Sequence, residues 1–303
     1  MAKRAAAAAR RRPGFLERLG AGVPERTQEV VAQAVLRVLL VVFILVAGYL
    51  LIQEMKAYVM GLERFQVSPA TLNFAAVPSW VTPGIEQQLA RLPDLPERFS
   101  ILEPHLAARV AQAYQRNPWV AEVTQVERLF PNRLRVGLLL RQPVAAVRFR
   151  GSYCLVDGEG VRLPLTYRSW PQPGFKLPIV TGATTQPPGS GTVWEDEAVQ
   201  AGCTVAELLR AYGFDRRLRI TAVDASNLGS RVRGRHPDIV LHTASGAYIK
   251  WGRSPLKWYP GDGSQTVTRK LHYLRYLVEH RIDLRRLEHA DVRFDRLMLK
   301  DRS

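Results

Sequence analysis

Residues 38–52 read VLLVVFILVAGYLLI, a run of fifteen residues without charge in which only the Tyr49 hydroxyl can form a strong side-chain hydrogen bond. A helix needs about 20 residues to cross the hydrocarbon core of a bilayer. Apolar residues continue upstream over residues 30–36, and the Arg37 side chain can extend along the helix while its charge stays among the headgroups. We therefore predict a transmembrane helix over residues 34–53.

The charges beside this run predict its orientation. Residues 1–37 carry eight Lys and Arg against three Glu, which accounts for +5 of the net charge of +16. Basic residues stay on the cytoplasmic side, so residues 1–33 form a basic cytoplasmic tail and residues 54–303 an exported ectodomain of a single-pass inner-membrane (cytoplasmic-membrane) protein. Two alternatives are a cleaved signal peptide and a buried core helix. No small-residue cleavage site follows the run, and the basic region before it is long for a signal.

Composition bounds the rest of the chain. With 303 residues, 47% hydrophobic and 23% charged, it has room for two globular domains beside the tail. The basic surplus is typical of nucleic-acid-binding proteins, but an exported domain argues against that partner. The tail either contacts anionic lipid or only sets topology. Cys154 and Cys203 lie in the exported part, where either a disulfide or two buried thiols is possible.

Hydrophobic periodicity predicts a small α+β domain at residues 65–142. A strand at 65–74 precedes two helices, and a hairpin follows over 120–140 with its turn at Phe130-Pro131-Asn132. The helical faces carry Ile85, Leu89 and Leu92, then Leu106, Val110 and Tyr114. The order strand, helix, helix, strand, strand predicts a three-stranded sheet with helices on one face.

Residues 143–303 predict a mixed β domain with flanking helices. Strands are expected at 145–149, 153–156, 161–163 and 219–224, helices at 197–212 and 265–280, and a hairpin pairs 239–243 with 247–251. The second helix carries a core-facing stripe of Val267, Leu271, Leu274 and Val278. A last strand runs over Ala290–Phe294, breaks at Asp295-Arg296 and continues to residue 300.

No combination of residues in the sequence predicts catalysis. Ser254-Pro255-Leu256-Lys257 fits an S-x-x-K pattern without the other elements of penicillin-binding enzymes. Residues 261–266 lack the lysine of a phosphate loop and are read as a turn with Ser264 as helix N-cap. The six histidines have no metal spacing, and the acids at 195–197 suit a helix start. We predict no enzyme activity, cofactor, metal or small-molecule substrate.

Three segments of the chain resemble the FtsQ/DivIB family of bacterial cell-division proteins. The first comprises Asn117–Val120, Val126–Leu134 and Arg141–Ala145, which look like the end of the POTRA domain that this family carries beside the membrane. Tyr153–Gly160 is similar to the opening strands of the family's β domain, and Ala290–Arg296 to its closing strand. The resemblance implies a POTRA-like domain at 65–142 and an FtsQ-type β domain at 143–303.

By this resemblance the chain is a non-catalytic scaffold of the septal divisome that binds small bitopic proteins of the FtsB and FtsL type. A terminal strand at a sheet edge offers unpaired N–H and C=O groups to an extended partner segment. The implied partner-binding residues are Asp291, Val292, Arg293, Phe294 and Asp295. Phe294 is either an interface aromatic or a core residue.

Two rival functions stay open at the level of sequence. One is a POTRA-type chaperone or assembly factor for exported proteins, and the other is a wall-modifying enzyme that uses Ser254 or Lys257. The identity of the partners, the relative orientation of the two domains, the redox state of the cysteines and the oligomeric state are not predicted.

Overall fold

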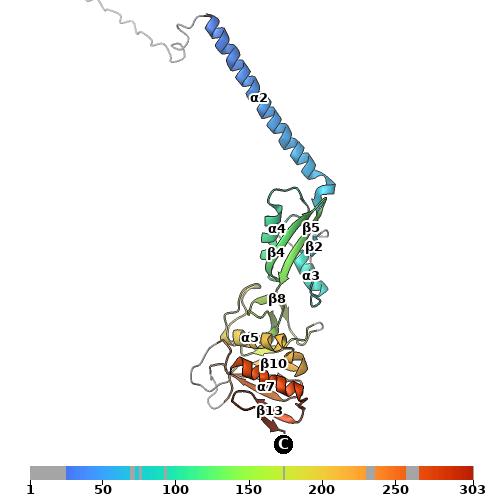
Figure 1. Ribbon diagram of the computed structural model, residues 1–303, viewed down its shortest axis with the longest axis vertical. Coiled ribbons are helices and arrows are strands. Elements are labelled where there is room, and N and C mark those ends of the chain that lie inside the picture. Colours follow the sequence, from blue (N-terminus) through green and yellow to red (C-terminus); the bar gives the residue numbers. More distant parts are fainter. Residues whose placement is uncertain are drawn as a thin grey trace, which may run out of the picture. The chain divides into compact units, whose positions relative to one another are not determined.

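The computed structural model describes residues 25–68, 72–74, 77–91, 94–172, 175–229, 236–256 and 266–302, with only the backbone described at 25–28, 72 and 73. The chain divides into two units, residues 1–63 and 64–303 (Figure 1). Most of the predicted basic tail lies outside the described residues. The fold is α+β, as predicted, with one long N-terminal helix followed by mixed helices and sheets.

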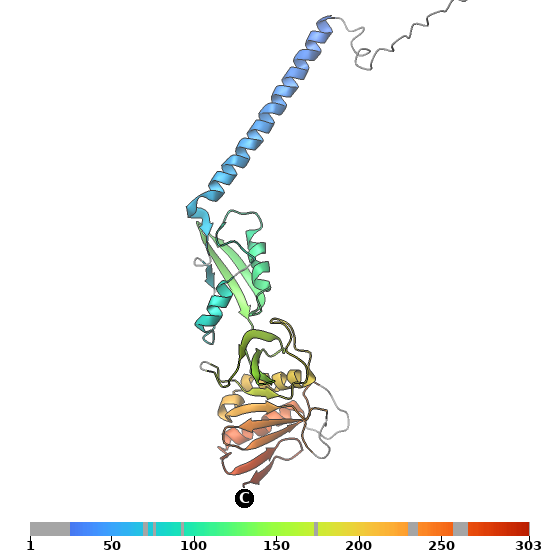
Figure 2. The same cartoon turned by 180° about the vertical axis from the view of Figure 1, so that it is seen from behind.

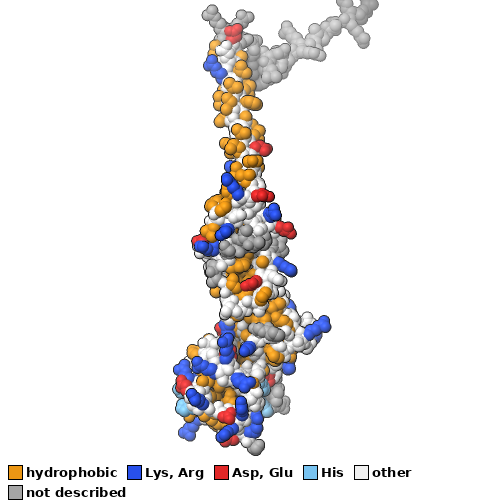
Figure 3. All heavy atoms as spheres, turned by 90° about the vertical axis from the view of Figure 1, so that its right-hand side faces the viewer, with side chains coloured by type: hydrophobic (Ala, Val, Ile, Leu, Met, Phe, Trp, Pro, Cys, Tyr) orange, Lys and Arg blue, Asp and Glu red, His pale blue; other side chains and the backbone are white. Residues whose placement is uncertain are grey.

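Helix α2 (Glu25–Gly61) carries the apolar run. Its segment Glu29–Gly61 is long and apolar enough to cross a membrane, and no part of its apolar window is buried in the protein. Figure 3 shows hydrophobic side chains along the exposed surface of this helix. At 1.5 Å per residue, 37 residues span about 55 Å, more than the roughly 30 Å of a hydrocarbon core. The predicted bounds, 34–53, are therefore shorter than the helix, which continues on both sides.

The second unit begins with a three-stranded sheet in the order β2-β5-β4. Strands β4 (Val120–Leu129) and β5 (Arg133–Leu140) form the predicted antiparallel hairpin, and β2 (Leu72–Phe74) runs parallel to β5. A separate pair joins β1 (Gln66–Val67) to β3 (Phe99–Ser100). The single strand expected at 65–74 was wrong, because its two ends pair with different partners.

Two helices pack on this small sheet, as predicted. Helix α3 (Pro83–Ala90) has proline in its first turn, where no backbone donor is needed, and α4 (Leu106–Gln115) follows β3. Their apolar faces are fully buried together with residues of β5; this cluster includes Ile85, Leu89, Leu106, Val110, Tyr114, Leu134 and Val136. Leu92, expected on the same face, lies outside the described residues.

The rest of the unit is built on one nine-stranded sheet in the order β14-β13-β12-β11-β10-β9-β6-β7-β8 (Figures 1 and 2). Most neighbours are antiparallel, but β9 runs parallel to β6 and β10, and β12 runs parallel to β13. The strands are β6 (Ala145–Phe149), β7 (Ser152–Val156), β8 (Arg162–Tyr167), β9 (Ile179–Thr181), β10 (Ile220–Asp224), β11 (Ile239–Thr243), β12 (Tyr248–Gly252), β13 (Leu287–Asp291) and β14 (Met298–Asp301).

The large sheet has one apolar face that packs against helices. Directly paired residues on six successive strands form a buried row; they are Val147, Val180, Val223, Leu241, Ile249 and Ala290. Helices α5 (Glu197–Ala211), α6 (Phe214–Arg217) and α7 (Val267–Glu279) supply the other side of this core. Cys154 and Cys203 are buried in it as free thiols.

Helix α7 begins two residues later than expected. Its N-cap is Thr266, whose hydroxyl accepts from the Arg269 N–H, whereas the predicted cap, Ser264, lies outside the described residues. Leu271 and Leu274 are buried as predicted, and Val267 and Val278 pack against the same core. Leu277 joins them, which adds one residue to the predicted apolar stripe.

The first two sequence segments that carry the family resemblance contact each other. Arg141, just after β5, forms an ion pair with Asp157, just after β7, at 2.8 Å, and a second with Glu159 at 2.9 Å. Asp157 also accepts from the N–H groups of Glu159 and Val161, which closes the expected glycine turn. The apolar cluster under α3 and α4 continues across this junction to Leu155.

Candidate functional site

Strand β14 lies at one edge of the large sheet. It pairs with β13 alone among the described strands, in a register that joins Asp291 to Met298 and Ala290 to Leu299. All four of its residues are exposed. In an antiparallel pair, alternate N–H and C=O groups point away from the neighbour, so the outer edge of β14 presents unpaired main-chain donors and acceptors.

The predicted last strand, Ala290–Phe294 with a continuation to residue 300, does not have the bounds of the observed strands β13 and β14. Strand β13 ends at Asp291 instead of continuing to Phe294, and a turn occupies 292–297 before β14. The Asp291 carboxylate accepts from the Arg293 N–H at 3.1 Å, an Asx turn that diverts the backbone from the sheet. A period-two pattern does not reveal such a local competing hydrogen bond, because Val292 and Phe294 still alternate with polar residues.

The structure separates the five predicted partner-binding residues into two groups. Asp291 and Val292 are buried, and Arg293 is largely covered. Phe294 and Asp295 reach the surface, so the alternative of a core-buried Phe294 was wrong. The Asp295 carbonyl accepts from the Tyr273 hydroxyl at 2.6 Å, and its carboxylate pairs with Arg269, so α7 holds this turn in place.

Exposed apolar side chains lie on β14 and in the turn before it. Phe294 is 46% exposed, Met298 48% and Leu299 42%. We call β14 together with Phe294 the C-terminal edge surface. Sequence reasoning singled out Phe294 but passed over Met298 and Leu299, although two apolar residues in a terminal strand next to charged residues were a usable signal.

Arg293 connects the buried and exposed parts of the turn. Its Nη2 donates to Asp291 Oδ2 at 2.7 Å, and its guanidinium lies 4.9 Å from the centre of the Phe294 ring. Burial alone would raise the pKa of the Asp291 carboxyl, but the hydrogen bonds from Arg293 and the charge of Lys250 outweigh it and hold this pKa below its usual value. Gly252, at the end of β12 with φ of +89°, leaves the space that the Arg293 side chain occupies.

A polar cluster lies on β12, β13 and β14. Lys300 Nζ reaches the Glu288 carboxylate at 2.5 Å, a cross-strand ion pair that lowers the pKa of Glu288 and raises that of Lys300. Tyr248 stacks on the His289 ring with centroids 5.2 Å apart. Lys250 Nζ lies 3.1 Å from His289 Nε2. Burial and the nearby Lys250 charge lower the pKa of His289, so this ring is neutral at pH 7 and accepts from Lys250.

The residues considered for catalysis have local structural roles where the structure describes them. Ser254 is buried and its hydroxyl accepts from the Leu256 N–H at 3.2 Å, while Lys257 lies outside the described residues. Asp196 caps α5 by accepting from the N–H groups of Ala198 and Val199, and the acidic run lies at the start of this helix, as predicted. Within the described ranges, no three His, Cys, Asp or Glu side chains come together as metal ligands.

These observations define an α+β protein with one helix suited to a membrane and an open strand at the end of its large sheet. No family model matches the chain. The chain is similar to the cell division protein FtsQ of Koribacter versatilis (strain Ellin345), with 26% identity over 186 residues. The match covers 60% of this chain and 46% of that protein, so this chain spans less than half of its relative's length.

Proposed function

We propose that this protein is a bitopic scaffold of the bacterial division complex, without catalytic activity, that binds other membrane proteins through the C-terminal edge surface. The similarity to a cell division protein supports a role in cell division. The apolar helix α2 fits a single-pass membrane protein. The observation that carries the proposal is β14, an exposed edge strand that carries two exposed apolar side chains and follows a third, Phe294.

Binding at this surface would proceed by strand addition. An extended partner segment pairs with the free edge of β14, and the main-chain hydrogen bonds supply affinity without regard to side chains. The exposed side chains of Met298 and Leu299 on β14, and of Phe294 in the turn before it, select the partner by burying apolar area. Proteins of the FtsB and FtsL type, small bitopic division proteins, are the partners we propose.

The topology we propose follows from charge. The eight Lys and Arg before the apolar run remain in the cytoplasm, and residues 54–303 lie outside the inner membrane at the division septum. This arrangement puts the C-terminal edge surface in the compartment where cell wall is made. The POTRA-like and β domains, 65–142 and 143–303, belong to the same proposal.

Site-specific photo-crosslinking in dividing cells tests the proposal. A photoreactive phenylalanine analogue replaces Phe294, and the crosslinked products are identified by mass spectrometry. Tyr212 is the matched control position, because it is an aromatic residue of nearly the same exposure, 47%, at the end of α5. We expect an adduct with a small bitopic protein from position 294 and none from position 212. Equal products from both positions, or none from 294, would overturn the site.

A further inference from the structure

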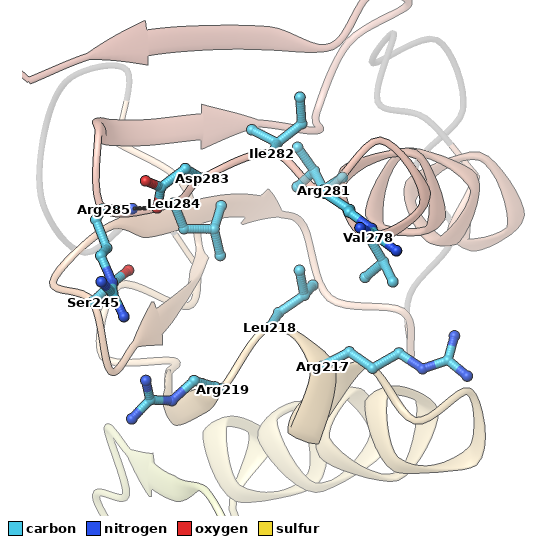
Figure 4. A pocket seen from close by; sticks show the side chains of 11 residues that line it. Arg217, Leu218, Arg219, Ser245, Val278, Arg281, Ile282, Asp283, Leu284 and Arg285 are labelled. Carbon is cyan, nitrogen blue, oxygen red and sulfur yellow. Dashed lines mark hydrogen bonds between the residues drawn. The ribbon is translucent and has the colours of Figure 1, made fainter.

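A pocket of about 250 Å³ lies at the end of the large sheet near the C-terminus of α7 (Figure 4). Three connections form it: the turn after α6, the β11–β12 turn and the link from α7 to β13. Its floor is apolar and comprises Leu218, Leu277, Val278, Ile282 and Leu284. In Figure 4 Leu218 and Leu284 point toward the middle of the pocket.

Four arginines surround this floor: Arg217, Arg219, Arg281 and Arg285. All four are exposed. Unlike Arg141 and Arg293, which have carboxylate partners, none of the four guanidinium groups has an ion pair or hydrogen bond with another described residue. The single acid in the lining, Asp283, accepts from the Arg285 N–H and lies 3.8 Å from Arg286. Among the described residues, the rim therefore carries positive charge that no carboxylate neutralises, and its guanidinium donors have no protein acceptor.

Two of these arginines occupy positions where the backbone favours glycine. Arg219 has φ of +52° after α6, and Arg281 has φ of +49° after α7. A side chain in this left-handed region costs backbone energy that glycine would avoid. The chain thus holds two guanidinium groups on the rim at the expense of local stability.

We infer that this arginine-rimmed pocket, distinct from the C-terminal edge surface, binds an acidic peptide segment of a partner protein and encloses one apolar side chain of it. Guanidinium groups form bidentate hydrogen bonds with carboxylates, and four of them match a segment with several Asp or Glu. The floor of leucine, isoleucine and valine takes the apolar residue that lies between those acids.

Size and composition favour a peptide over other anions. Pockets that enclose small molecules measure about 300–1,000 Å³, so this one accommodates a side chain of a larger partner. An acidic wall polysaccharide would satisfy the arginines but would leave the five apolar floor residues in contact with water. A peptide with acidic residues on both sides of an apolar one satisfies both features.

Fluorescence polarisation with the full chain in neutral-detergent micelles tests the inference. The probe is a labelled peptide with four glutamates around one leucine. We expect the double variant Arg219→Gly/Arg281→Gly to bind about tenfold more weakly, since it loses two charges. Glycine suits both backbone conformations, so misfolding does not account for the loss. Arg150→Gly is the matched control, because Arg150 is also exposed, with φ of +45°, but lies in the β6–β7 turn.

Two further probes distinguish the occupants. Replacing the peptide's leucine by serine should weaken binding about tenfold, because the apolar floor of the pocket then remains in contact with water. Polygalacturonate, an acidic polysaccharide, should compete poorly. Phe294→Ala should bind the peptide like wild type, which separates this pocket from the C-terminal edge surface. The inference is overturned if wild type does not bind the leucine peptide, or if Arg219→Gly/Arg281→Gly binds it as tightly as Arg150→Gly does. It is also overturned if the serine peptide or polygalacturonate binds wild type as tightly as the leucine peptide does.

Discussion

Arg293 donates from Nη2 to the buried Asp291 carboxylate at 2.7 Å while its guanidinium lies 4.9 Å from the centre of the Phe294 ring. One side chain therefore stabilises the end of β13 and positions the exposed aromatic of the C-terminal edge surface. We therefore expect the stability of the turn and the proposed partner binding to be coupled through Arg293, and the two can be measured separately.

Replacing Arg293 should destabilise the protein. Arg293→Leu leaves the Asp291 carboxylate buried without its guanidinium partner, which should cost about 1–3 kcal/mol of the free energy of unfolding. Urea denaturation of residues 58–303 measures the change. Arg296→Leu, at an exposed arginine in the same turn, should stay within about 0.5 kcal/mol of wild type. An equal effect of both substitutions would show that the ion pair contributes nothing specific.

Gly252 should be intolerant of a side chain. A Cβ there would lie 2.8 Å from Arg293 Cγ, and the residue has φ of +89°. Gly252→Ala should therefore lower the free energy of unfolding by about 1–3 kcal/mol and displace Arg293, which weakens partner binding as well. Gly189→Ala has only an ordinary contact at 3.9 Å and is the control. Wild-type stability and binding in Gly252→Ala would contradict the packing described for Arg293.

The stability of the protein should fall in weak acid because of His289. Its folded-state pKa lies below the ordinary value of 6.5, so the unfolded chain binds the proton more readily. Stability is then complete above pH 6.5 and decreases as the pH falls below it. The free energy of unfolding is measured by urea denaturation between pH 7.5 and 5 for wild type and for His289→Gln. The difference, wild type minus variant, should decrease as the pH falls below 6.5. A flat difference would mean that His289 titrates normally.

Labelling of introduced cysteines tests the topology. Both native cysteines are buried and free, so they provide a low background toward a membrane-impermeant maleimide. In spheroplasts, Glu195→Cys, at an exposed position before α5, should react, and Ala8→Cys should react only after lysis. The reverse pattern would place residues 64–303 in the cytoplasm and end the division-scaffold proposal.

Local elements were predictable because their signals are local. The spacing of Leu106, Val110 and Tyr114 placed α4, and the change to a period of two at residue 120 placed the β4–β5 hairpin. Both elements follow directly from which face must be buried. The acidic run at 195–197 likewise predicted the start of α5, where Asp196 is the N-cap in the structure.

Long-range pairing was beyond such reasoning. Strand β9 joins β6 and β10 in parallel from distant parts of the sequence, and nothing in its three residues specifies either neighbour.

Single side chains also departed from their sequence patterns. Lys270 is buried on α7 with Nζ 5.2 Å from the centre of the Trp251 ring, where an amphipathic pattern predicts a solvated lysine. The end of β13 depends on one hydrogen bond that the Asp291 carboxylate accepts from the Arg293 N–H, and residue propensities do not reveal it.

The most direct test of the central claim is co-purification of partner proteins with the full chain from solubilised membranes. The comparison is between wild type, Phe294→Ala and Tyr212→Ala, two exposed aromatics whose truncation should each change stability by less than about 1 kcal/mol. We predict that wild type and Tyr212→Ala retain a small bitopic division protein and that Phe294→Ala loses it. Equal retention by all three folded proteins would contradict binding at the C-terminal edge surface.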